Sequence, residues 1–210
     1  MMKTSATILM LLMVFFAART MAIEEPAYTV MAEFDEVEYR QYAAYLVAET
    51  LVTENSDRNE AANIGFRRLF KYISGDNVTA TSMAAGTQMQ GRASESIAMT
   101  APVRQRSDAT GWSIAFIVPA EYTRQSVPQP TNPLITIQAI PPQLMAVHRY
   151  SGRWTDENFA EHQAILLEHL KQNDIQPQGK VVGASYNPPF MPPFLRRNEV
   201  MVRVDKTPQH

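Results

Sequence analysis

The chain has 210 residues, of which 45% are hydrophobic, and it carries a formal net charge of −2 at pH 7. It has no cysteine, which excludes disulfides, thiolate catalysis, cysteine-ligated zinc and covalently attached c-type haem. No basic excess is available to neutralise phosphates, which argues against nucleic acid as a general partner.

The first 22 residues have the composition of a secretory signal peptide. Lys3 precedes an apolar run, Ile8–Ala18, which is shorter than the roughly 20 residues that span a bilayer. We expect cleavage near Ala22, export to the periplasm and a single domain over residues 23–210. An uncleaved membrane anchor is the alternative.

Alternation of apolar and polar residues predicts β-strands from residue 27 onward. The expected strands cover Tyr28–Phe34, Tyr45–Val52, Trp112–Val118, Leu134–Ile140 and Val200–Val204. Several shorter strands are expected between them, so the chain is predicted to be rich in antiparallel sheet.

Two segments have helical spacing instead. Asp57, followed three residues later by Glu60, forms a capping-box-like start for a helix that ends near Gly75. Thr155 is the expected N-cap of a second helix, which runs to about Asn173.

The two helices indicate an internal pseudo-repeat. Each follows a similar strand, in which Leu46 and Leu144 hold matching positions, and each half continues to an apolar, proline-containing run. We therefore predict an α+β fold, in which about eight antiparallel strands curl into a partly closed barrel with two flanking helices. Gln125–Pro133 would link the halves.

Catalytic motifs are missing from the sequence, which has no G-x-S-x-G, no H-E-x-x-H and no glycine-rich phosphate loop. His148 is a weak candidate for a catalytic base or metal ligand. His162 and His169 lie two helical turns, or roughly 10 Å, apart, which is too far for them to hold one metal. We expect no enzymatic activity.

The first helix offers candidate ligand contacts. Arg67 and Lys71 stand around Phe66 and Phe70, an arrangement that could bind an apolar anion such as a porphyrin with propionates. The same pattern is typical of an ordinary amphipathic helix.

The apolar run Ile97–Val103 contains a second candidate, Met99. A methionine suits a flat apolar ligand, and its thioether can ligate haem iron, although core filling is the commoner role. Because Pro102 lacks an amide hydrogen, we expect a strand here whose pairing ends at that proline.

Six motifs occur in the order in which the SOUL family of haem-binding proteins has them. They are EVEYRQY (36–42), GFRRLFKYISGDN (65–77), IAMTAPV (97–103), FIVPAEYT (116–123), YSGRW (150–154) and YNPPFMPPFLRRNEV (186–200). The sequence therefore resembles this family from about Tyr28 to Val204, most specifically in M-T-x-P-V and in Y-[ND]-x-P with R-N-E-V.

The resemblance implies a distorted eight-stranded barrel related to bacterial effector-binding domains, and noncovalent binding of haem or another tetrapyrrole in a hydrophobic groove beside the first helix. Lys71 matches a basic position implicated in contact with a propionate, and Asn63 stands at a second such position. Gln41 occupies the place of a suggested axial histidine. The resulting set of candidate cofactor-binding residues is Lys71, Arg67, Phe66, Phe70, Asn63 and Met99.

Two alternatives remain open. The cleft could bind another amphipathic small molecule or a protein partner. It could also serve a hydrolase, for which Glu49, Glu95, Tyr45 and Tyr150 are the available groups.

Overall fold

The computed structural model describes residues 23–53, 57–84 and 93–208, so the predicted leader at 1–22 lies outside the described residues. The first part of the chain forms β1 (Tyr28–Phe34), β2 (Val37–Tyr42), β3 (Tyr45–Val52), α1 (Arg58–Ile73), β4 (Asn77–Val78), α2 (Ala80–Ala84), β5 (Val103–Ser107) and β6 (Trp112–Ile117). The remainder forms β7 (Gln129–Pro130), β8 (Ile135–Ile140), β9 (Gln143–Tyr150), α3 (Asp156–Gln172), β10 (Val182–Ser185), the 3₁₀ turn η1 (Pro193–Leu195) and β11 (Asn198–Arg203).

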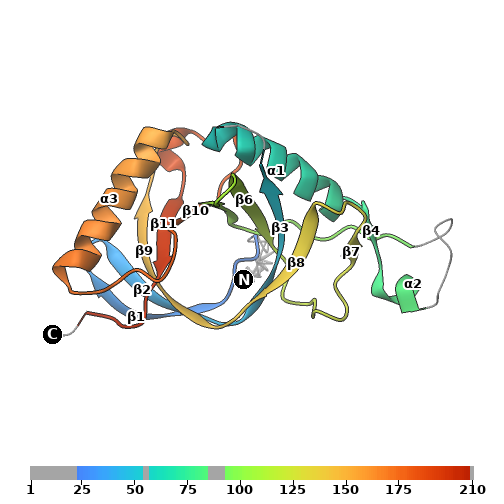
Figure 1. The fold of residues 1–210 in the computed structure, drawn as a ribbon, viewed down its shortest axis with the longest axis horizontal. Helices are drawn as coiled ribbons and strands as arrows, with labels where there is room; N and C mark the ends of the chain where they lie inside the picture. The colour runs from blue at the N-terminus through green and yellow to red at the C-terminus, as the bar shows by residue number, and fades with distance from the viewer. Residues whose placement is uncertain (1–22, 54–56, 85–92, 209–210) are drawn as a thin grey trace, which may run out of the picture.

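Nine strands form one sheet in the order β1-β2-β9-β11-β10-β5-β6-β3-β8, and neighbouring strands in it are antiparallel. The sheet curls into an open barrel, with α1 and α3 on its outer side (Figure 1). The predicted α+β fold is confirmed. The sheet has nine strands rather than eight because β1 adds an edge strand beyond β2.

The strand order also confirms the pseudo-repeat. The order β2-β9-β11-β10 in one half of the sheet corresponds to β8-β3-β6-β5 in the other. In chain order the first half begins with β2 and β3, and the second half begins with β8 and β9. The first strand of each half pairs with the other half, since β2 pairs with β9 and β8 pairs with β3. The two halves meet where β10 pairs with β5.

Helix α1 begins as the sequence predicts, because the Asp57 side chain accepts a hydrogen bond from the Glu60 amide at 2.8 Å. Its buried face includes Ala61, Gly65 and Leu69. The side chains of Ala61 and Leu69 pack on β3 and β6 in the larger core cluster, which also contains Ile97, Ile114 and Phe116.

Helix α3 begins after the predicted N-cap, Thr155, whose hydroxyl accepts from the Asn158 amide at 3.2 Å. Leu166 and Leu170 are fully buried and pack against β9 and β11 in a second cluster. Each helix therefore covers one half of the sheet. No helix of the described residues is both long and apolar enough to cross a membrane.

The inner face of the sheet carries a buried ion-pair network. Arg40 and Glu199, both almost without solvent contact, are 3.0 Å apart. Arg40 also pairs with Glu38, while Glu199 accepts hydrogen bonds from Tyr186 at 2.7 Å and from Arg197 at 3.0 Å. Burial beside the Glu199 carboxylate raises the pKa of the Tyr186 phenol. Both buried charges are thus fully partnered.

The prediction of a strand ending at Pro102 is wrong. Residues 93–99 have no regular structure, Ile97 enters the core, and Pro102 directly precedes the first residue of β5. Proline is tolerated at the entrance of a strand because no ladder donor is needed there. The run Ile97–Val103 therefore leads into a strand and does not leave one.

Gly65 marks the closest approach of α1 to the sheet. A Cβ atom there would lie 2.4 Å from Ile114 Cγ1, so the helix can reach this depth only without a side chain. We expect Gly65→Ala to lower the free energy of unfolding by about 1–3 kcal/mol, measured by urea titration, through overpacking.

The control is the same substitution in an Ile114→Gly background, where all three obstructing atoms of the Ile114 side chain are absent. There the cost of Gly65→Ala should be much smaller, because alanine favours helix by about 1 kcal/mol over glycine. Equal costs in both backgrounds would contradict close packing as the cause.

Candidate functional site

A groove of about 680 Å³ opens between α1 and the loops around β5 and β10. Its size lies in the range of roughly 300–1,000 Å³ that is typical of small-molecule sites. Helix α1 contributes Arg58, Ala62, Asn63 and Phe66. The groove lies over the junction of the two halves of the sheet, since Val103 and Gln105 of β5 and Ser185 of β10 also line it.

The two walls come from runs that are not equivalent in the pseudo-repeat. Met99, Thr100 and Ala101 belong to the run before β5, whereas Pro188, Pro189 and Pro193 belong to the run after β10, although β5 and β10 hold matching positions. The Thr100 hydroxyl donates to the Ile117 carbonyl at 2.6 Å, which fixes the first wall to β6. Two stretches 87 or more positions apart in the sequence thus enclose one space.

Aromatic rings provide much of the apolar surface. Phe66 stacks on Phe70 with ring centroids 5.9 Å apart and meets the edge of Phe116 at 5.2 Å. The Trp154 indole, which also lines the groove, donates to Asn198 Oδ1 at 2.7 Å. These contacts hold the rings in place, so a flat apolar ligand would meet a largely preformed surface.

Arg58 at the start of α1 is the most unusual group in the groove. Its side chain is 8% exposed, its guanidinium lies 4.2 Å from the centroid of the Phe159 ring on α3, and its buried Nε has no hydrogen-bond partner. Burial lowers the pKa of this guanidinium, against the opposing charges of Tyr150 and Asp156.

No carboxylate of the described residues forms an ion pair with Arg58. A buried cation without an anionic partner is costly, and a ligand carboxylate would supply both the missing charge and an acceptor for Nε.

Two more arginines, Arg153 and Arg196, line the same groove, whereas none of its described lining residues is acidic. The Arg196 guanidinium lies over the Trp154 ring at 4.2 Å and donates to the carbonyls of Met191 and Pro189. An apolar groove with three cations and no carboxylate favours an apolar ligand with negatively charged groups.

The structure brings only some of the candidate residues together. Asn63, Phe66 and Met99 line the groove, and Phe70 extends its apolar surface through the stack on Phe66. Arg67 and Lys71 are exposed on α1 and do not line it.

Gln41, at the position of a suggested axial histidine, also lies outside the groove. It stands on β2, and its side-chain amide donates to the Tyr42 carbonyl at 3.3 Å.

His148 lies under α3, away from the groove. It is 2% exposed, and its Nε2 is 2.9 Å from Nδ1 of His162, while its Nδ1 is 3.1 Å from the Glu36 carbonyl. Both ring nitrogens therefore have protein partners. The described residues contain no group of three His, Asp or Glu side chains that could hold a metal.

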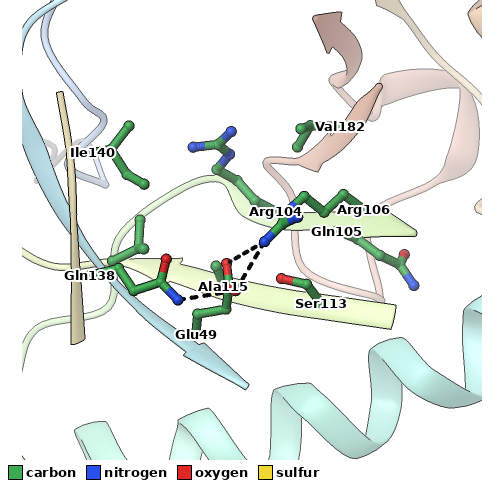
Figure 2. Close-up of a pocket in the computed structure, with 10 residues that line it drawn as sticks. Glu49, Arg104, Gln105, Arg106, Ser113, Ala115, Gln138, Ile140 and Val182 are labelled. Carbon is green, nitrogen blue, oxygen red and sulfur yellow. Dashed lines mark hydrogen bonds and ion pairs between the residues drawn. The ribbon is translucent and has the colours of Figure 1, made fainter. Parts of the chain in front are cut away.

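A second, smaller cavity of about 170 Å³ lies on the inner face of the sheet (Figure 2). Glu49 Oε1 accepts hydrogen bonds there from Arg106 at 3.1 Å and from Gln138 at 3.3 Å, and Arg104 donates to the Tyr45 hydroxyl. Its polar groups largely satisfy one another, and its volume is a quarter of that of the groove.

The four groups considered for a hydrolase do not converge. Glu49 lines the small cavity, and Tyr45 accepts a hydrogen bond from Arg104, which lines it too. Glu95 accepts from the Tyr122 hydroxyl at 3.0 Å, and Tyr150 stacks on His162 under α3. These neighbourhoods are separate, so the structure assembles no nucleophile and base from this set.

Sequence reasoning missed Arg58, Arg153, Trp154 and Arg196 as groove residues. Arg153 and Trp154 belong to the YSGRW motif and Arg196 to the motif YNPPFMPPFLRRNEV, so a signal was available. The sequence contains no such signal for Arg58, because a polar residue is ordinary at the start of a helix.

Comparison with known proteins identifies one family. Residues 23–203 match the family described as SOUL heme-binding protein. No curated protein is similar enough in sequence to count as a match.

Solved structures share the fold at low sequence identity. The EcmrR C-terminal domain superposes with a TM-score of 0.52 at 10% identity, over 86% of this chain and 99% of that one. A hydrolase from Listeria innocua has a TM-score of 0.48 at 9% identity, over 83% and 94% of the two chains.

The two histidines of α3, His162 and His169, should make stability depend on pH. Burial lowers the pKa values of His162 and His169, with the nearby charges of Glu161, Glu36 and Asp35 opposing it. The unfolded chain therefore takes up more protons near pH 6 than the folded protein does, and stability should fall as the pH drops below about 6.5.

Thermal unfolding between pH 7.5 and 5.5 tests this expectation. His162→Gln, which keeps a hydrogen-bonding side chain but cannot titrate, should reduce the loss of Tm across that interval. An unchanged loss in the variant would show that other groups cause the pH dependence.

Proposed function

The chain belongs to the SOUL heme-binding protein family, and we propose that it binds haem or a related tetrapyrrole noncovalently in the groove between α1 and the loops around β5 and β10. The family is one of binding proteins, which agrees with the expected lack of a catalytic constellation. The sequence predicts haem or another tetrapyrrole as the noncovalent cofactor, which is the kind of ligand that this family binds.

The observation that carries the location of the site is the buried Arg58 side chain in the lining of an apolar groove, since its Nε has no hydrogen-bond partner. A tetrapyrrole has a flat apolar ring and anionic propionates. Its ring would lie against Phe66 and Trp154, and a propionate would receive the free Nε–H of Arg58. Arg153 is placed to meet a second carboxylate.

Iron ligation has one candidate among the described lining residues, the Met99 thioether. No histidine of the described chain lines the groove. Bound haem would supply an iron centre with its redox chemistry, while the chain would hold and orient the ring. An iron-free tetrapyrrole or another amphipathic anion would use the same arginines, and is the second candidate ligand.

Export belongs to this proposal. The basic start, apolar run and small residues of 1–22 support secretion of a protein that handles tetrapyrrole in the periplasm. The absence of cysteine is compatible with that compartment.

Titration with haemin tests the site. We expect a saturable change in the Soret band, and Arg58→Gln should raise Kd about tenfold, which corresponds to loss of about 1.4 kcal/mol from one charge-assisted contact. Arg67→Gln is the matched control, because Arg67 is an exposed arginine of the same helix outside the groove.

Arg153→Gln provides a second test if Arg58→Gln folds poorly, since Arg153 is exposed at the rim. It should weaken binding without lowering Tm. A flat titration of the unmodified protein at tens of micromolar would refute tetrapyrrole binding. Equal losses for the Arg58 and Arg67 variants would refute this location.

Met99→Leu separates ring binding from ligation. Leucine keeps most of the apolar volume, so affinity for an iron-free porphyrin should stay within about twofold. The absorption spectrum of the haem complex should change if sulfur is a ligand, because leucine has no donor atom. An identical haem spectrum in the variant would exclude Met99 as a ligand.

A further inference from the structure

The loop between β10 and β11 exposes an unusual amount of apolar surface. It contains the tetrapeptide pattern Pro-Pro-Phe-x twice in succession, at 188–191 and 192–195. Phe190 is 86% exposed, Phe194 is 75% exposed and Leu195 is 60% exposed. Single exposed apolar residues are ordinary, but three within six positions mark an interaction surface.

The loop is held in a defined conformation. The Met191 amide donates to the Pro188 carbonyl at 3.0 Å, and the Leu195 amide donates to the Pro192 carbonyl at 2.9 Å, so each tetrapeptide forms a turn. Arg196 ties the turns together through its hydrogen bonds to the carbonyls of Met191 and Pro189. Both phenylalanines take the third position of their turn, and their exposure is a property of this ordered backbone.

The charge around the loop is positive. No Asp or Glu occurs between Ile175 and Asn198. Arg196 and Arg153, at the adjoining rim of the groove, have no acidic partner among the described residues, whereas Arg197 is paired with Glu25 and Glu199. Exposed aromatic rings on a loop that adjoins unpaired arginines match the interface of a bilayer that contains anionic lipid.

We propose that this loop, residues 187–196, inserts Phe190 and Phe194 into the surface of an anionic phospholipid bilayer. The braced turns would dock with little loss of conformational freedom. Pro188, Pro189 and Pro193 of the same loop form a wall of the groove, so docking would bring the groove mouth to the membrane surface. An apolar ligand could then pass between bilayer and groove with little exposure to water.

A bilayer fits these observations better than a folded protein partner. Phe190 and Phe194 are exposed on successive turns and neither lines the groove, whereas binding of a peptide or helix requires a concave apolar surface. The flanking cations add attraction for lipid phosphates that depends on salt. This inference is independent of the ligand in the groove, and its test uses no tetrapyrrole.

The lack of native cysteine allows a direct test in the full chain. Phe190→Cys and Phe194→Cys, each labelled with the environment-sensitive fluorophore nitrobenzoxadiazole, are mixed with vesicles of phosphatidylcholine alone or with phosphatidylglycerol added. We expect a blue shift and brighter emission at both positions with the anionic vesicles, reduced by 0.5 M salt, an ionic strength at which the Debye length is only about 4 Å.

Leu134→Cys is the matched control, because Leu134 is an exposed apolar residue, 54% accessible, just before β8 and outside this loop. Its label should not shift with either kind of vesicle. An equal shift at Leu134, as adsorption through another part of the chain would produce, overturns the proposal, and so does the absence of a shift at 190 and 194.

Vesicle partitioning provides a second measurement. The double variant Phe190→Ser, Phe194→Ser should partition onto anionic vesicles roughly tenfold less well than Leu134→Ser, since two buried rings are lost. Equal partitioning overturns the proposal. A label at 190 that shifts with lipid-free envelope protein but not with vesicles also overturns it, in favour of a protein partner.

Discussion

The pairing of β5 with β10 is the contact on which the rest of the molecule depends. It runs from Val182 opposite Arg106 to Ser185 opposite Val103, and it is the seam along which the two halves form one sheet. Each half brings its own helix, α1 over β3 and β6, and α3 over β9 and β11. The strands at the seam lie between the helices, so the groove forms over them, and the two proline-containing runs that flank the seam become its walls.

Buried charged side chains are paired on the inner face of the sheet, whereas the buried Arg58 in the groove is not. Arg40 and Glu199 are desolvated but surrounded by each other, by Glu38 and by Tyr186. Arg58 is nearly as buried, yet it forms no ion pair with a carboxylate of the described residues, and its guanidinium lies against the face of the Phe159 ring. The first arrangement is complete in the protein alone, as a structural network should be. The second lacks an anion, as a receptor for a carboxylate should.

The groove and the loop that borders it form a continuous functional surface. Arg196 lies over Trp154 in the groove and also fixes the two turns that present Phe190 and Phe194. One side chain therefore couples the shape of the wall to the position of the exposed rings. In the small cavity on the opposite face of the sheet, Arg106 and Gln138 both donate to Glu49, so the polar groups there are paired within the protein.

The sequence determined the elements and the family. Asp57 and Thr155 set the starts of the two helices by local capping, and period-two alternation located Tyr45–Val52 to the residue. Local signals cannot show which face of α1 borders the groove. The sequence therefore predicts Arg67 and Lys71 as binding residues together with Phe66 and Asn63, although of these four only Phe66 and Asn63 line the groove. Arg58 became significant only in the tertiary structure, because its burial and the lack of an anion beside it arise from elements distant in the chain. Capping and periodicity act over a few residues, whereas the groove requires the long-range pairing of β5 with β10.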